Sequence, residues 1–461
     1  MHESLTETLA AYWATARYGD LPDEVTWAAK RFLIDTLAAG VAGADTAVSH
    51  ATRDAAAYAL QPASGSRADV SVLWGSPWRL PPPQAALVNG TAAHALELDD
   101  FDGCGHSGAV VIPAVCAMAD RVGASGQQTL TAIVAGYDLA ARVLEGAGGY
   151  RPHNDLGWHS SGTCGSFGAA AAVARLLSLD PPTFTHALGI AGTFTGGIWA
   201  FLADGAMTKR FHPGKAAENG LTATLLARAG MTGPRFILDA NWGGFFSTYS
   251  GQAATPDATI AGLGVDFRIL TSGIKPYACC RGMHGCIDSL LDTMASGSVE
   301  HPSIERMIVH GDARTCRQFG RQRIDTLLDA QFSLPYVLAV VAESGRATLD
   351  QFEPLRHDDP VIHRLMAATD VVADRSLVPG ENPELEIRLR DGRRLSHQTP
   401  VGRGGARRPL SDADVVAKAR SLIGPVLGDA RAGAIVDRVL TLEAVDDVRS
   451  LTAMLVRPSE A

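Results

Sequence analysis

The residues that could do chemistry are most concentrated in one stretch, His94–Pro113. It reads HALELDDFDGCGHSGAVVIP and holds His94, Glu97, Asp99, Asp100, Asp102 and His106. Charged side chains are costly to bury without partners, so this cluster is either a solvated loop or a working site. Because His94 and Glu97 are three residues apart, we expect them on one helical face, with Asp99 and Asp100 at the helix end.

Three interpretations of this cluster remain open. Histidine and carboxylate are good metal ligands, but the chain lacks the HExxH pattern of many zinc enzymes. The cluster could also be a solvated helix end. We favour an acid/base or substrate-binding site, since histidine changes charge near neutral pH.

The loop around His106 is rich in glycine. Gly103, Gly105 and Gly108 leave the backbone free to approach a ligand, and a helix expected from about Ala109 offers free N–H groups to an anion. The alternative is a mobile loop that carries an incidental histidine.

Three further segments carry polar side chains. The hydroxyls of Gly157–Thr163 could cap the next helix or bind a carboxylate. The cationic segment Ala206–Lys215 is expected between helices, either as a surface patch or with an anion-binding or basic lysine. In Lys275–His284, the paired cysteines are expected to pack, and His284 is the better chemical candidate.

The composition excludes some classes of protein. The 461 residues carry a net charge of -9, which argues against nucleic acid as a partner. The sequence shows no evident signal peptide and no apolar run of about 18 residues, so no membrane partner is expected. Seven cysteines without CxxC spacing suggest reduced thiols and a cytoplasmic protein.

The pattern of apolar residues predicts a mainly α fold. Helices are expected at Glu24–Ala42, Gly165–Leu177 and Gly220–Ala229 in the first 260 or so residues. Beyond Gly264 the pattern predicts a strand at Met307–His310, a helix at Leu334–Ala342 and a hairpin turning at Asp391-Gly392, followed by a helix capped by Ser411. We therefore expect a large all-helical domain built from residues 1–267 and 406–461, with a smaller α+β domain, 268–405, inserted in it.

Five blocks in this order resemble the MmgE/PrpD family, which includes 2-methylcitrate dehydratase, cis-aconitate decarboxylase and iminodisuccinate epimerase. The blocks are His94–Pro113, Gly157–Leu177, Lys209–Gly220 with Gly233-Pro234, Lys275–Asp288 and Gln331–Tyr336. The resemblance implies a helical domain with an α+β lid, a homodimer, an active site in the cleft between the domains, and no cofactor. It also implies a small carboxylic acid as substrate.

The resemblance also implies which residues act. The expected catalytic residues are Glu97, His106, His159, Lys209 and His284. The expected substrate-binding residues are Asp99, Asp100, Phe101, Ser160, Arg281 and Tyr336, and no metal ion is expected. Removing a C–H proton beside a carboxylate needs a positioned base, which histidine supplies, and a cation for the enolate charge, which Lys209 supplies.

The first block departs from the family's usual Asp-Phe-Asp-Asp-Thr, because this chain has Glu97-Leu98-Asp99-Asp100-Phe101. Phe101 removes a hydroxyl that could bind a carboxylate, and Trp199 and Phe201 are expected to add an apolar wall. We expect a cofactor-independent lyase of the 2-methylcitrate dehydratase or cis-aconitate decarboxylase type. The alternatives are an epimerase or isomerase of the iminodisuccinate epimerase type, a non-catalytic small-acid-binding protein and, last, a metal-dependent hydrolase.

Overall fold

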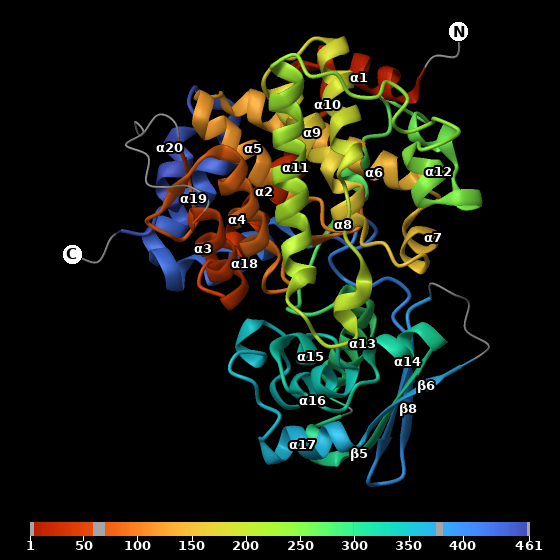
Figure 1. Ribbon diagram of the computed structural model, residues 1–461. Helices are drawn as coiled ribbons and strands as arrows, with labels where there is room; N and C mark the ends of the chain where they lie inside the picture. Colours follow the sequence, from red (N-terminus) through yellow and green to blue (C-terminus); the bar gives the residue numbers. More distant parts are fainter. Residues whose placement is uncertain (1–3, 59–69, 298, 375–380, 459–461) are drawn as a thin grey trace. The chain divides into compact units, whose positions relative to one another are not determined.

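The chain folds mainly into helices, which divide into two compact units. The computed structural model describes residues 4–58, 70–297, 299–374 and 381–458 (Figure 1). The first unit comprises the described parts of 1–95, 99–274 and 411–461, and the second comprises 96–98 and 275–410.

The first unit is a bundle of helices with two small sheets. Its helices are α1 (Leu5–Thr15), α2 (Asp23–Gly43), α3 (Ala47–Tyr58), α4 (Pro82–His94), α5 (Gly108–Val122), α6 (Gly126–Gly146), α7 (Tyr150–Asp155), α8 (Ser160–Thr163), α9 (Gly165–Leu176), α10 (Pro181–Thr193), α11 (Thr208–Arg228), α12 (Phe245–Tyr249), α18 (Asp412–Leu427), α19 (Asp429–Leu440) and α20 (Arg449–Thr452). Strands β1 (Ser71–Val72) and β2 (Arg79–Leu80) pair, as do β3 (Asp100–Phe101) and β4 (Gly273–Ile274). The expectation of an all-helical domain is therefore wrong in detail, because short extended segments pair where the chain passes between helices.

Small residues allow the central helices of this unit to approach closely. A Cβ atom added at Gly168 in α9 would lie 2.6 Å from the Cβ of Ala140 in α6. One added at Gly220 in α11 would lie 2.5 Å from the backbone nitrogen of Ala170 in α9. Since real Cβ atoms do not approach other atoms so closely, glycine is required where these helices cross.

Helix α11 starts earlier than expected. The segment Ala206–Lys215 was expected between helices, but all of it from Thr208 onward belongs to α11. Pro213 is the sixth residue of the helix, beyond the first turn, so it removes one helical hydrogen bond. Gly214 is explained by packing, since a Cβ there would lie 2.3 Å from the backbone oxygen of Leu87 in α4. The Pro-Gly pair marks a helix crossing and not a break.

The C-terminal helices pack on the N-terminal ones, as the blue and red ribbons in Figure 1 show for α18 and α2. Ser411 caps α18 by accepting a hydrogen bond from the backbone N–H of Asp414, which confirms the expected cap. The buried Asp35 in α2 lies 2.6 Å from Lys418 in α18. Residues from both ends of the chain thus form one core.

The second unit combines helices with a four-stranded sheet. Its elements are α13 (His284–Ala295), β5 (Ile304–Gly311), α14 (Ala313–Phe319), α15 (Leu327–Gln331), α16 (Leu334–Ser344), α17 (Pro360–Ala367), β6 (Thr369–Ala373), β7 (Glu384–Leu389) and β8 (Arg394–His397). The strand order is β6-β5-β7-β8, with β5 and β6 parallel and the other pairs antiparallel. The expected strand, helix and hairpin are confirmed, and alternate residues of β7 are buried.

Within the described residues, no single helix is both long and apolar enough to span a membrane. Helices α2 and α3 pass that test only as a pair, across a bend of 86°.

Candidate active site

Four histidines, one aspartate and one lysine gather in the first unit. We call these residues the polar cluster: His94, Asp99, His106, His159, Lys209 and His212. They come from the end of α4, the loop before α5, the residue before α8 and the first turns of α11. Segments far apart in sequence therefore meet at one place.

His94 is the last residue of α4 and is fully buried. Its Nδ1 lies 2.8 Å from Oδ2 of Asp99. Burial lowers the pKa of His94 well below its usual value, although the neighbouring Asp99 acts in the opposite direction. His94 is therefore neutral at physiological pH, and its Nε2 has no hydrogen-bond partner among the described residues.

His106 follows the glycine loop, as expected from the sequence. Its Nδ1 lies 2.8 Å from the backbone oxygen of Asp100 and 3.1 Å from Oδ2 of Asp99. Its ring centroid is 4.3 Å from that of His94. Gly105 has a φ of +117°, and a Cβ there would lie 2.7 Å from Oγ of Ser161. Glycine is thus needed to bring the loop against α8.

His159 and His212 share a hydrogen bond, with 3.0 Å between their Nδ1 atoms. Such a bond needs one protonated and one bare Nδ1, so at most one of the two rings can be charged. Burial lowers the pKa of His159 well below its usual value and that of His212 to about 4. The rings of Trp199 and Phe201 lie 5.4 and 6.0 Å from that of His159, which places the expected aromatic residues beside the cluster.

Lys209 lies in the first turn of α11 and is only 2% exposed. The interpretation of its segment as a surface patch is therefore wrong for this side chain. Its positive charge contributes to lowering the pKa of His94 and His212. The cluster thus holds one buried cation, Lys209, and one carboxylate, Asp99, beside neutral imidazoles, and the ammonium is suited to a carboxylate of a ligand.

Two hydroxyl groups lie next to the loop that carries His106. Ser160 and Ser161 open α8, and a Cβ at Gly105 would lie within 3.0 Å of either Oγ. Both Oγ atoms are buried, without a hydrogen-bond partner among the residues described. Since buried polar groups are normally paired, these hydroxyls are available to a ligand.

Asp100 has a different place from the one expected. Both carboxylate oxygens accept hydrogen bonds from the backbone N–H of Gly108, at 3.0 and 2.9 Å, at the start of α5. Burial, and then the charge of Asp99, raise its pKa to about 8. We assign Asp100 to holding the loop on α5, because its oxygens are buried and used there.

Asp100→Asn should gain stability relative to the unchanged protein as the pH rises from 5 to 8. The folded pKa of about 8 exceeds the unfolded value, so folded Asp100 keeps a proton that the unfolded chain releases, and stability falls with pH in this window. The full effect is about 1.4 kcal/mol per pH unit. Thermal unfolding midpoints of both proteins across this range measure it, and parallel pH profiles would contradict it.

We expected Glu97 to share a helical face with His94, but it does not. Helix α4 ends at His94, and Glu97 adopts left-handed backbone with a φ of +55°. Its carboxylate belongs to the second unit, where Oε2 lies 3.1 Å from Nζ of Lys275. Both side chains are fully buried. Lys275 was not singled out in the sequence, although it opens one of the five blocks.

The other expected residues of the second unit are engaged within it. His284 begins α13, with its Nε2 3.2 Å from the backbone oxygen of Cys279. Arg281 donates to the backbone oxygens of Gly402 and Arg403, both at 3.0 Å.

Tyr336 is fully buried in α16. Its hydroxyl donates to the backbone oxygen of Gln351 at 2.8 Å and accepts from the backbone N–H of Arg356 at 3.1 Å. These bonds favour a structural role over the expected substrate contact. Phe101, in the first unit, is also buried, in strand β3.

Two groups of side chains could hold a metal ion. The ligand atoms of His94, His106 and His159 lie within 4.8 Å of one another, and so do those of Asp99, Asp100 and His106. Neutral imidazoles are good ligands for zinc. At His94 the negative charge of Asp99, which favours a cation, has a larger effect than the positive charge of Lys209, which opposes one.

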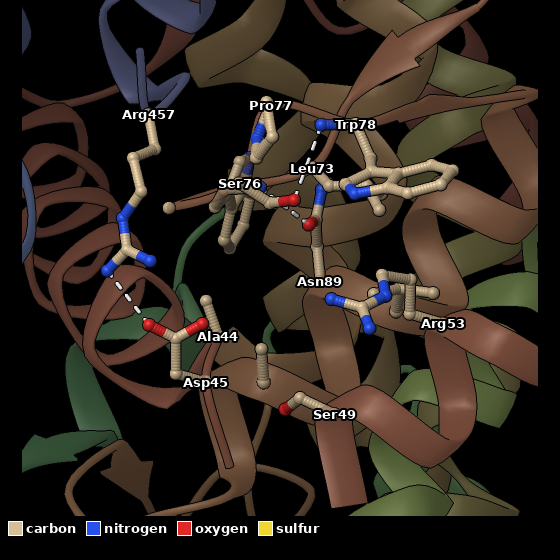
Figure 2. Close-up of a pocket in the computed structure, with 14 residues that line it drawn as sticks. Ala44, Asp45, Ser49, Arg53, Leu73, Ser76, Pro77, Trp78, Asn89 and Arg457 are labelled. Carbon is tan, nitrogen blue, oxygen red and sulfur yellow. Dashed lines mark hydrogen bonds and ion pairs between the residues drawn. The ribbon is translucent and has the colours of Figure 1, made fainter. Parts of the chain in front are cut away.

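A cavity of about 150 Å³ lies elsewhere in the first unit, and no residue of the polar cluster lines it (Figure 2). Arg457 at its rim pairs with Asp45 at 2.8 Å, and Arg53 lies over the ring of Trp78 at 5.9 Å. Asn89 bonds to the backbone of Trp74 and is therefore structural. The chemistry of this unit is concentrated in the polar cluster and not in this cavity.

Comparison with known proteins agrees with the resemblance. Residues 7–257 match the MmgE/PrpD N-terminal domain, and residues 277–442 match the MmgE/PrpD C-terminal domain. A cis-aconitate decarboxylase-like protein, oryM, of Aspergillus oryzae is 30% identical, over 98% of this chain and 97% of its own length.

Two further relatives carry the name cis-aconitate decarboxylase. The human protein is 28% identical, over 100% of this chain and 96% of its own length. The Aspergillus terreus protein is 27% identical, over 97% of this chain and 95% of its own length. These matches support a lyase. With both domain models matched in order across most of its length, the chain belongs to the MmgE/PrpD family.

Proposed function

We propose that this protein is a lyase that acts on a small di- or tricarboxylic acid by moving a proton next to a carboxylate, in the manner of a cis-aconitate decarboxylase and without a bound cofactor. One observation carries the proposal: a buried ammonium, Lys209, lies among neutral imidazoles with bare nitrogens. The names of the relatives support the decarboxylase type.

The cluster offers each group that this chemistry needs. Lys209 and the hydroxyls of Ser160 and Ser161 are suited to binding carboxylates. When CO2 leaves, its bonding electron pair stays on the substrate, where the charge of Lys209 stabilises it. A histidine then supplies the proton that forms the new C–H bond. His106 and His159 are the candidates for that transfer.

The assignments of Glu97, His284 and Arg281 rest on the family resemblance. Within their own unit, Glu97 is paired with Lys275, and Arg281 and His284 contact backbone oxygens. Variants of these three residues, each assayed with the acid that the protein turns over, test their assigned roles.

Proton NMR in heavy water tests the proposal. The protein is incubated with cis-aconitate, 2-methylcitrate and other di- and tricarboxylic acids. We expect loss of CO2 from one of them, with a deuteron in the product. Water loss without CO2 would identify a dehydratase, and exchange with inversion an epimerase. Binding of these acids without exchange or product would overturn the proposal in favour of a binding protein.

Removal of metal ions should leave turnover unchanged. The proposed reaction places a substrate carboxylate beside Lys209 and transfers the proton directly through His106 or His159, so no step needs a metal ion. Activity is measured after dialysis against a chelator, together with the metal content by mass spectrometry. Activity that is lost on dialysis and restored by zinc would instead make His94, His106 and His159 metal ligands.

A further inference from the structure

One carboxylate oxygen lies beside two imidazoles of the polar cluster. Oδ2 of Asp99 is 2.8 Å from Nδ1 of His94 and 3.1 Å from Nδ1 of His106. Asp99 is fully buried, so solvent does not compete for this oxygen. The two rings, with centroids 4.3 Å apart, are thereby tied to one acceptor.

We propose that Asp99 is a positioning residue, which fixes His94 and His106 in the tautomer protonated at Nδ1 and so keeps both Nε2 atoms bare for the substrate. This role rests on the proposed function, in which an imidazole moves the proton. It differs from the direct substrate contact that the sequence suggested for Asp99.

The tautomer of His106 follows from its neighbours. Its Nδ1 faces two oxygens, the backbone oxygen of Asp100 at 2.8 Å and the carboxylate of Asp99 at 3.1 Å. A backbone oxygen is always an acceptor, and an ionised carboxylate is an acceptor only. Nδ1 must therefore carry the proton. In the neutral ring, Nε2 then holds the lone pair that a base needs.

The same reasoning applies to His94, with one addition. Burial keeps this ring neutral, and its single proton is held on Nδ1 toward Asp99. Its Nε2 is a buried acceptor without a partner among the described residues. Leaving such an atom unpaired costs about 1–3 kcal/mol, so a ligand hydroxyl, carboxyl or water that donates to it would recover that energy.

The proposed step balances with water as the source of the proton. Nε2 of His106 takes up a proton from water, and the resulting imidazolium is stabilised by Asp99 through Nδ1. The C–C bond to one substrate carboxylate breaks, CO2 leaves, and the electron pair stays on the substrate as an enolate beside Lys209. His94 stays neutral and accepts a hydrogen bond from the substrate. Transfer of the proton from Nε2 to carbon forms the new C–H bond and leaves Nε2 bare again.

Asp99→Leu tests this role. Both Nδ1 atoms contact Oδ2, and leucine offers neither an acceptor nor a donor in its place, so at least one ring should shift its proton to Nε2. NMR of the protein labelled with ¹⁵N only in histidine reports the tautomers, and His94→Gln and His106→Gln assign the signals. We expect protonated Nδ1 in both rings of the unchanged protein, and protonated Nε2 in at least one ring of the variant.

Kinetics provide the second measurement. Asp99→Leu should lower kcat by about 10²-fold, with KM changed much less, because a base in the wrong tautomer still allows binding. Asp120→Leu is the matched control, since Asp120 is a buried acid of the same unit that bonds to Val72 and Thr452 and to no histidine of the cluster. It should change neither the tautomers nor kcat.

Two results would overturn the inference. One is protonated Nε2 at His94 and His106 in the unchanged protein. The other is an Asp99→Leu protein with unchanged tautomers and kcat. The tautomers are measured without any substrate. If no carboxylic acid is turned over while both rings are protonated at Nδ1, the proposed reaction fails and the role of Asp99 in holding the rings stands.

Discussion

Lys209→Met is expected to lower kcat/KM for the cognate acid by about 10²- to 10³-fold, the usual cost of removing one group that stabilises developing charge. Lys209 is 2% exposed, and its charge already acts on His94 and His212. Methionine keeps most of the side-chain volume without the ammonium, so α11 should stay folded. Steady-state kinetics measure the loss, and circular dichroism with thermal unfolding verifies the fold.

Lys215→Met is the matched control for this prediction. Lys215 lies on the same helix, but its side chain is 48% exposed and pairs with Glu218 at 2.7 Å. Loss of that surface ion pair should cost at most about 1 kcal/mol of stability and no activity. Equal kinetics for the Lys209 variant and this control would remove Lys209 from the mechanism.

Local patterns in the sequence were sufficient for most of the elements. The apolar spacing over Glu24–Ala42 gave α2 to within one residue at each end. The alternation before Asp391-Gly392 gave the pairing of β7 with β8. These predictions succeed because one face of each element is buried, and a buried face requires apolar residues at regular spacing within that element.

Contacts between helices that are far apart in the sequence could not be predicted from such local patterns. The pair Pro213-Gly214 looks like a helix break, yet α11 runs through it because Gly214 meets Gly90 of α4. The reason for that glycine lies more than a hundred residues away in the chain. As a consequence, the segment of Lys209 was expected between helices, but this residue is buried in the first turn of α11.

The sequence indicated which segments carry the candidate site, but not which contacts their individual side chains make. The sequence pointed to the segments of His106, His159 and Lys209, which the structure brings together in the first unit. It included His94 in the cluster His94–Pro113 but not among the expected catalytic residues, and it gave His212 no role of its own within the cationic segment Ala206–Lys215. The left-handed backbone of Glu97, which takes that side chain away from the helical face of His94, also has no local signal in a non-glycine residue.

His106→Gln should lower kcat by about 10²- to 10⁴-fold, the range attributed to a positioned acid or base. Burial depresses the pKa of His94 and His159, which makes both weak bases. The ring of His106 contacts Asp99 through Nδ1, and its side chain is 14% exposed. His106 can therefore exchange a proton with water between turnovers. Glutamine retains a donor toward the oxygens of Asp99 and Asp100 but cannot take up a proton.

The measurement for His106→Gln separates binding from chemistry. Incorporation of a deuteron into the product should disappear, while calorimetric affinity for the acid changes by less than about tenfold, since Lys209 and the serine hydroxyls still hold the carboxylates. His50→Gln, which changes a half-buried histidine of α3 beside Asp45, serves as the control and should keep full incorporation. If incorporation survives in His106→Gln and vanishes in His159→Gln, then the proton is transferred by His159, whose hydrogen bond to His212 would take over the role assigned to Asp99.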